Sequence, residues 1–515
     1  MRLSAPRGTG TWRAWGSTPH GEDGLAASPD VGGAPQGCRF TPVRRASHSP
    51  PGESQLPDRV TVQTHGLTLG YIMAQMTMAR RLALLPLLLL VPGAAVAAPL
   101  ARREVLPNGI VLLVAERPAV PIVAVRAYFR AGSAFDPPDA PGLANLTARL
   151  LTRGTATRTG ADIDRAIEFV GGSLESDASR DGITVSLAVL KKDLSLGLDL
   201  LADVVRRPSF PEPELARTRK QIQAGIQRSE ENPEAVAGRE LMRLVYLGHP
   251  YGHPADGTRE SVGGLTREQV VGYYAEHVRP DAAIIAVVGA VTLDEARKEI
   301  LARCGDWARP TSPPPAVPTG SATSAPEAST IARTLSQTTV AMGRRAIRQD
   351  QPDYFPLVVA SYILGGGTNS RLFFRVREER GLAYGVYSYV SPGRYGSAEV
   401  VGLRTRTAEA TKALDIARAE MARIAREPVG AHELDAAKAY LIGGFPLHLD
   451  TSAKVANFLV GVEEQGLGLD YADRFREGIA RVTAADVQRA AQRYLLPEAF
   501  AVVTVGTPAP VSGAR

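Results

Sequence analysis

The chain is poor in cysteine, in histidine and in excess charge, and each shortage excludes a class of protein. Only Cys38 and Cys304 occur among 515 residues, too few for the disulfide framework of a small secreted domain. The formal net charge is +6, and most of that excess lies before residue 98. No basic stripe is interleaved with aromatic residues, so the sequence does not predict nucleic-acid binding.

Long apolar runs are also scarce. The run Leu82–Val91 is too short for a membrane span. It follows Arg80-Arg81 and precedes the small-x-small sequence Ala95-Val96-Ala97, as in a secretory signal peptide. We therefore predict a signal peptide over 76–97, a mature chain that begins at Ala98 without a membrane span, and a periplasmic or secreted location.

Two segments lack periodicity and divide the chain. Residues 1–75 are rich in Pro, Gly and Ser, which predicts a disordered segment or one upstream of the true start. Residues 310–328 have the Pro/Ser/Thr/Ala composition of a linker. The expected domains are therefore 98–309 and 329–515.

The two halves share an internal repeat. In each, a Thr precedes a helix, a Pro ends it, and a buried apolar strand follows. The same number of residues separates Thr266 from Thr483, Pro280 from Pro497, and Gly289 from Gly506. Each half mixes helical and alternating patterns, so the predicted fold is α+β with a duplicated domain. The helices predicted in the second half include 353–364, 370–379, 408–426 and 432–445, and a strand is predicted over 385–390.

Short pieces along both halves carry a family likeness. They are Leu106-Pro-Asn-Gly109, Arg130-Ala-Gly-Ser133, Pro141-Gly-Leu-Ala144, Gly248-His-Pro-Tyr-Gly252, Leu364-Gly-Gly-Gly-Thr-Asn-Ser-Arg-Leu372 and Val376-Arg-Glu-Glu-Arg-Gly-Leu-Ala-Tyr384. In this order they resemble pitrilysin/insulinase-type (inverzincin) metallopeptidases, and two-domain subunits of the mitochondrial-processing-peptidase type in particular. The resemblance implies two homologous α/β-sandwich domains that form half of a clamshell, and therefore a partner.

The zinc motif of that family is missing. Active members carry H-x-x-E-H after Gly-Leu-Ala, with two His ligands and a Glu that activates water. Asn145, Ala148 and Arg149 stand at these positions, and the distal Glu would fall near Ala224-Gly225. We predict no zinc in this chain and expect zinc in a homologous H-x-x-E-H partner subunit.

No other residues form a metal-site pattern. After residue 97 the histidines are His249, His253, His277, His432 and His448. Prolines and a glycine around His249 and His253 disfavour a helix that presents both, so a packing or substrate-side loop is the expected role. Cys304 has no basic or His pattern beside it and is predicted to be a small core residue.

Arg377 and Tyr384 are the functional residues that the resemblance preserves. It implies that both donate hydrogen bonds to the substrate carbonyl and its oxyanion. Composition alone favours a solvated charge cluster around Arg377 and a core position for Tyr384. Gly365-Gly366-Gly367 lacks phosphate-loop spacing and predicts a connection between helices, while the resemblance leaves a gating role open.

Two functions of different classes follow. The first is the non-zinc subunit of an exported heteromeric zinc metallopeptidase, inactive alone, that acts on unstructured peptides with its partner. The alternative is a catalytically inactive peptide-binding or scaffolding pseudo-protease of the cell envelope. An autonomous protease is disfavoured, because no Ser/His/Asp or Cys/His motif is present.

Overall fold

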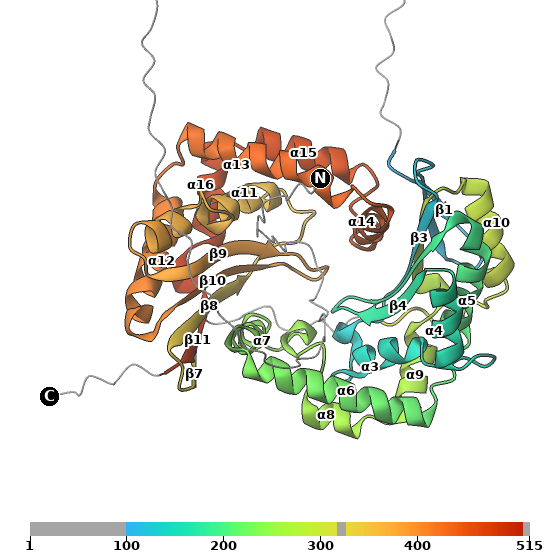
Figure 1. The fold of residues 1–515 in the computed structure, drawn as a ribbon. Coiled ribbons are helices and arrows are strands. Elements are labelled where there is room, and N and C mark those ends of the chain that lie inside the picture. The colour runs from blue at the N-terminus through green and yellow to red at the C-terminus, as the bar shows by residue number, and fades with distance from the viewer. Residues whose placement is uncertain (1–98, 317–325, 508–515) are drawn as a thin grey trace, which may run out of the picture. The chain divides into compact units, whose positions relative to one another are not determined.

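The computed structural model describes residues 99–316 and 326–507. The upstream segment, the predicted signal peptide and the middle of the predicted linker lie outside these described residues. Within them the chain is a mixed α and β protein built around two sheets (Figure 1).

The first sheet has six strands in the order β1-β2-β6-β3-β5-β4. Strand β6 lies between β2, to which it is parallel, and β3, to which it is antiparallel. It is buried along its whole length, because its two faces belong to two hydrophobic cores on opposite sides of the sheet. The strands are β1 (Arg102–Val105), β2 (Val111–Glu116), β3 (Ile122–Phe129), β4 (Ser173–Ala178), β5 (Ile183–Leu190) and β6 (Ala283–Gly289). The helices of this half are α3 (Leu143–Leu151), α4 (Gly160–Phe169), α5 (Leu194–Arg206), α6 (Glu212–Glu231), α7 (Pro233–Val245), α8 (Arg259–Gly264), α9 (Arg267–His277) and α10 (Leu293–Cys304).

The second sheet repeats the first from its second strand onward. Its order is β7-β11-β8-β10-β9. Its first pair, β7 with β11, is parallel, as β2 with β6 is in the first sheet. The strands are β7 (Ala328–Ala332), β8 (Gln337–Arg345), β9 (Ala383–Ser391), β10 (Ala398–Arg406) and β11 (Ala501–Gly506). The helices are α11 (Tyr354–Gly365), α12 (Ala410–Arg426), α13 (Ala431–Gly444), α14 (Ser452–Glu464), α15 (Tyr471–Arg481) and α16 (Ala484–Tyr494). This matching order confirms the predicted duplication.

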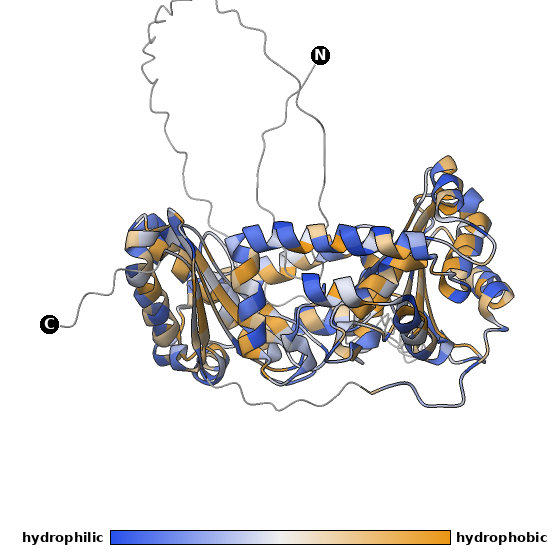
Figure 2. Cartoon of the chain, turned by 90° about the horizontal axis from the view of Figure 1, so that it is seen from below, coloured by the Kyte–Doolittle hydropathy of each residue, from blue (hydrophilic) through white to orange (hydrophobic). Residues whose placement is uncertain are grey.

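The two halves exchange a helix. Helix α7 of the first half packs on β8 and β11 of the second sheet, and α14 of the second half packs on β3 and β6 of the first (Figure 1). Both helices are amphipathic, as Figure 2 shows for the helices in general. Polar contacts also hold α14, since Arg103 binds Glu463 and Arg126 Nε donates to Asn457 Oδ1 at 2.7 Å.

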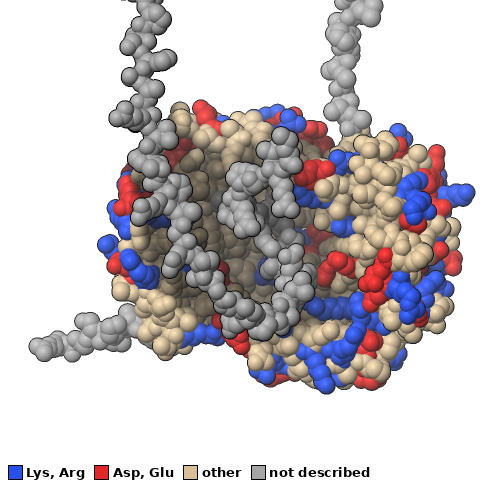
Figure 3. Space-filling view, in the orientation of Figure 1, with Lys and Arg blue, Asp and Glu red and all other residues tan. Residues whose placement is uncertain are grey.

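Several local predictions are confirmed. Thr266 and Thr483 each accept a hydrogen bond from the third helical residue, and both helices begin with a full capping box. Cys304 is buried, and burial raises the pKa of its thiol to about 11, so it is a core residue. Basic and acidic side chains are interspersed over the face drawn in Figure 3.

Candidate functional site

Helix α3 carries the positions that replace the zinc motif, and a buried carboxylate fixes its start. Gly142 precedes the helix with a φ of 94°. Asp136 accepts hydrogen bonds from the backbone amides of Gly142 at 2.7 Å and Ala144 at 2.8 Å. Burial raises the pKa of Asp136 to about 7, although the backbone amides oppose the shift. The sequence analysis did not identify Asp136 as a capping residue. The pattern that could have indicated it is an acidic residue shortly before the Pro-Gly that opens the helix.

The three motif positions offer no zinc ligand. Asn145 and Ala148 are buried, and Arg149 is half-buried. Arg149 Nε donates to Asn145 Oδ1 at 3.1 Å. An amide, a methyl group and a guanidinium cannot replace two imidazoles and a carboxylate, so the residues present do not fit a zinc ion.

The fourth position also lacks a ligand. Helix α6 packs against α3, and it carries Ala224 and Gly225 where the distal Glu would stand. A Cβ built on Gly225 would meet no atom within 4 Å, so the space beside it is open. Among the residues that the structure describes, no group of three or more His, Cys, Asp and Glu side chains could hold a metal.

Local packing places two of the remaining histidines, His249 and His277. The His249 ring accepts a hydrogen bond from the backbone amide of Tyr251, and burial lowers its pKa to about 4. His277 is buried against the Tyr273 ring, and burial also lowers its pKa. Both environments favour neutral imidazoles in packed surroundings.

Arg377 and Tyr384 lie together, as the resemblance implies. The Arg377 guanidinium carbon lies 4.7 Å from the ring centroid of Phe373 and 5.1 Å from that of Tyr384. Tyr384 is 73% exposed, which contradicts the core position that composition favoured. Gly381, with a φ of 58°, turns the chain between them. The result is a solvent-facing pair of donors, one charged and one phenolic.

Part of the predicted helix 370–379 differs from the expectation. Residues Phe373–Glu378 form a π-helix, η5, in which the amide of Glu379 donates to the carbonyl of Phe374 at 2.9 Å. A π-helix holds more residues per turn than an α-helix, so it alters the directions in which successive side chains leave the axis. Arg377 stacks on the two aromatic rings, while Arg375 reaches Glu420 of α12 at 3.5 Å.

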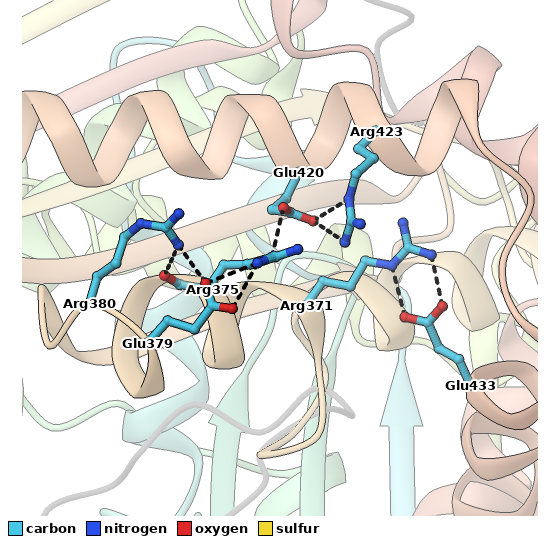
Figure 4. A network of polar contacts seen from close by, with 7 residues as sticks. All are labelled: Arg371, Arg375, Glu379, Arg380, Glu420, Arg423 and Glu433. Atoms are coloured by element: carbon cyan, nitrogen blue, oxygen red, sulfur yellow. Dashed lines mark hydrogen bonds and ion pairs between the residues drawn. The ribbon is translucent and has the colours of Figure 1, made fainter.

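A network of ion pairs anchors η5 to α12 and α13 (Figure 4). Its pairs are Arg371 with Glu433, Arg375 with Glu379 and Glu420, Arg380 with Glu379, and Arg423 with Glu420. The nearest carboxylate to Arg377, that of Glu378, is 3.9 Å away. Of the four arginines in 371–380, Arg377 is therefore the one that donates no hydrogen bond to a carboxylate within the described chain.

The glycine segment after α11 has a packing role. A Cβ at Gly365 would lie 2.4 Å from the backbone nitrogen of Ser388 in β9. A Cβ at Gly366 would lie 2.3 Å from the Tyr362 ring. Glycine thus lets the end of α11 approach β9, the strand that carries Tyr384. The gating role for 365–367 stays a prediction.

Comparison with known families matches both halves of the chain. Residues 111–259 match the model described as insulinase (peptidase family M16), and residues 264–441 match the one described as the peptidase M16 inactive domain. An uncharacterized zinc protease of Mycobacterium leprae is 30% identical over 68% of this chain and 79% of its own length. The chain belongs to the insulinase family. A further insulinase relative, an uncharacterized zinc protease of Mycobacterium bovis, is 29% identical over 81% of this chain and 94% of its own length.

Solved structures of the insulinase family share the fold. A peptidase M16 inactive domain from Pseudomonas fluorescens has a TM-score of 0.75 at 28% identity, covering 80% of this chain and all of that one. A protease from Helicobacter pylori has a TM-score of 0.73 at 17% identity over 79% of this chain, which shows the fold alone. The insulinase relatives are named zinc proteases, whereas the residues of this chain at the motif positions do not fit zinc.

Proposed function

We propose that this chain is the zinc-free subunit of an exported, heteromeric insulinase-type peptidase. It supplies Arg377 and Tyr384 to peptides bound at a homologous, zinc-bearing subunit. The observation that carries the proposal is the contrast between the two sites. Helix α3 offers no zinc ligand or general base, while Arg377 and Tyr384 are paired and face solvent, and ion pairs anchor the η5 segment that carries Arg377.

The chemistry of the pair suits an oxyanion. Attack of water on a peptide carbonyl places negative charge on its oxygen, and donors already aimed at that oxygen lower the barrier. The Arg377 guanidinium is permanently charged, and the exposed Tyr384 hydroxyl is a neutral donor. The partner's zinc would activate the attacking water, a role that no residue of α3 can take.

Reconstitution tests the proposal. The mature chain is purified alone and with each H-x-x-E-H homologue that co-purifies from the native envelope fraction, and hydrolysis of an unstructured peptide is measured. We expect no turnover from the chain alone and a higher turnover from the mixture than from the zinc subunit alone. If a homologue assembles with the chain and its turnover does not change, the chain is a peptide-binding or scaffolding pseudo-protease.

Export is a separate part of the proposal and has its own test. N-terminal sequencing of the protein from the envelope fraction should read from Ala98. A mature protein that retains Leu82–Val91 would contradict the signal-peptide prediction. Within the described residues, no helix is both long and apolar enough to cross a membrane.

A further inference from the structure

The positions that replaced the zinc ligands form a cluster of hydrogen-bond donors. Arg149 Nε donates to Asn145 Oδ1, and this bond fixes the amide orientation, because only the oxygen can accept it. The amide nitrogen of Asn145 is therefore the atom left over. It is buried, in a side chain that is 5% exposed, and it has no partner.

The guanidinium of Arg149 is also available. Within the described residues it makes the bond to Asn145 and no ion pair, so its terminal nitrogens keep their donors. Arg149 lies in the last turn of α3, where a cation interacts favourably with the helix dipole. That role would account for the charge of Arg149, but it leaves the buried amide nitrogen of Asn145 without an acceptor.

The neighbouring helix supplies no acceptor side chain at the position expected for the distal ligand. Helix α6 packs against α3 and presents Ala224, which is exposed, and Gly225, beside which a Cβ would meet nothing within 4 Å. Neither residue can supply an acceptor side chain. Asn145 and Arg149 thus carry unpaired donors one helical turn apart on α3, and such donors suit an anion with planar acceptor oxygens.

We propose that Asn145 and Arg149 bind a carboxylate of a bound peptide, either an acidic side chain or the peptide's C-terminus. The inference rests on the proposed function, because it names the peptide group that this half of the chain would select. A position that holds a cation in zinc-bearing relatives would here hold an anion, through a bidentate guanidinium contact and one amide hydrogen bond.

Peptide binding to the mature, full-length chain tests the proposal by isothermal titration calorimetry. Three versions of one short unstructured peptide are compared. The first has a central Glu and an amidated C-terminus, the second has Gln in its place, and the third has Gln with a free C-terminal carboxylate. We expect the first or the third to bind roughly tenfold more tightly than the second, with the preference reduced by added salt. The stronger of the two identifies the source of the carboxylate.

Variants assign the preference to these residues. Arg149→Gln should abolish the preference for carboxylate-bearing peptides. Asn145→Asp should also abolish this preference, because it gives Arg149 an internal carboxylate and removes the amide donors. Arg426→Gln is the matched control, because Arg426 is an exposed arginine in the last turn of α12, in the other half, and the preference should persist. Circular dichroism checks that each variant is folded.

The outcomes separate this inference from the proposed function. If all three peptides bind equally, or if Arg149→Gln keeps the preference for carboxylate-bearing peptides, the proposed carboxylate subsite is wrong. The proposed role of the chain in binding peptides is then retained. If no peptide binds, both the subsite and the proposed peptide-handling role are overturned.

Discussion

Arg377 and its arginine neighbours differ in what their guanidinium groups can still bind. Arg371, Arg375 and Arg380 are used by carboxylates of the described chain, whereas Arg377 stacks on two aromatic rings and keeps its donors. Stacking fixes the plane of the guanidinium without using its N–H groups. Stacking therefore holds the Arg377 guanidinium in one orientation with its donors unused, whereas the three neighbouring guanidinium groups are bound by carboxylates.

Kinetics of the reconstituted complex should show this difference. Tyr384→Phe keeps the ring over Arg377 and removes only the hydroxyl, and Arg377→Ala removes the charge. Each should lower kcat by roughly 10²–10³, the usual effect of losing one oxyanion donor, which is about 3–4 kcal/mol. The double variant should lose less than the sum of the two, because both donors serve one oxygen.

Arg380→Ala is the matched control, since it removes a neighbouring arginine that is paired with Glu379. It should leave kcat within about twofold of wild type, as expected for an exposed ion pair. Normal kcat and KM for assembled Arg377→Ala and Tyr384→Phe would show that these two residues are structural.

Glu399 makes stability depend on pH. It is fully buried in β10, and Ser361 and Ser388 donate to its Oε1 at 2.7 Å. Burial raises its pKa to about 7, from a usual value of 4.5, against the effect of these hydrogen bonds. The unfolded chain therefore loses this proton at a lower pH than the folded chain. The stability that Glu399 contributes is complete below about pH 4.5 and is lost as pH rises through about 7.

Urea unfolding at pH 5 and pH 8 checks this dependence. Glu399→Gln removes the titration, so its free energy of unfolding relative to wild type should rise by roughly 3 kcal/mol from pH 5 to pH 8. Glu427→Gln, at an exposed position at the end of α12, should change little between the two pH values. A constant difference between Glu399→Gln and wild type would mean that Glu399 does not titrate in this range.

At the scale of elements, the sequence predicts what is local and fails where an element needs a distant partner. Thr266 and Thr483 give helix starts, because the cap and its target lie within three residues. Helix α14 was not predicted, and no local pattern shows that its apolar face covers the sheet of the other half. The spacing of Arg377 and Tyr384 indicates a pair only through the family resemblance. Their stacking depends on the π-helix, which a helical pattern does not distinguish from an α-helix.

The exchanged helix predicts coupled unfolding of the halves. Leu459 of α14 is buried against the first sheet, so Leu459→Ala should lower the free energy of unfolding by about 2–5 kcal/mol. A protein prepared from Ala98 onward offers a probe in the first half, because Trp307 is then the only tryptophan, and it packs against Phe129. Its fluorescence should report the loss, although the substitution lies in the second half.

Leu447→Ala is the control for this experiment, since Leu447 is 64% exposed just before α14. It should change the free energy of unfolding by no more than about 0.5 kcal/mol. A Trp307 transition that is unchanged in Leu459→Ala would mean that the first half does not depend on α14.

At the scale of the whole molecule, the two related halves carry different candidate site residues. The first half carries the altered motif on α3, and the second presents Arg377 and Tyr384 on η5 and β9. Elemental analysis of the purified mature chain should therefore find no stoichiometric zinc, and a chelator should not change its melting temperature. One tightly held zinc ion per chain would contradict the reading of Asn145, Ala148 and Arg149.

Restoring the motif alone should not restore the metal. The variant Asn145→His, Ala148→Glu, Arg149→His supplies two imidazoles and a carboxylate but leaves Gly225 without a side chain. Adding Gly225→Glu supplies a further acidic side chain at the position expected for the distal ligand. We expect zinc uptake to be much stronger with all four changes, because three protein ligands are typical of catalytic zinc sites. Equal zinc content in the triple and quadruple variants would show that position 225 does not face the motif.

During synthesis on the ribosome, the first sheet is made well before α14, the helix that covers one of its faces. The first sheet is complete once β6 has emerged, yet the face that α14 covers stays open until residues 452–464 are made. At about 5–20 residues per second this interval lasts roughly ten to thirty seconds. A chain with an uncovered apolar face during that time is a natural client for a chaperone. If the protein is threaded unfolded across a membrane, the same delay keeps it from folding before the translocation machinery has engaged it.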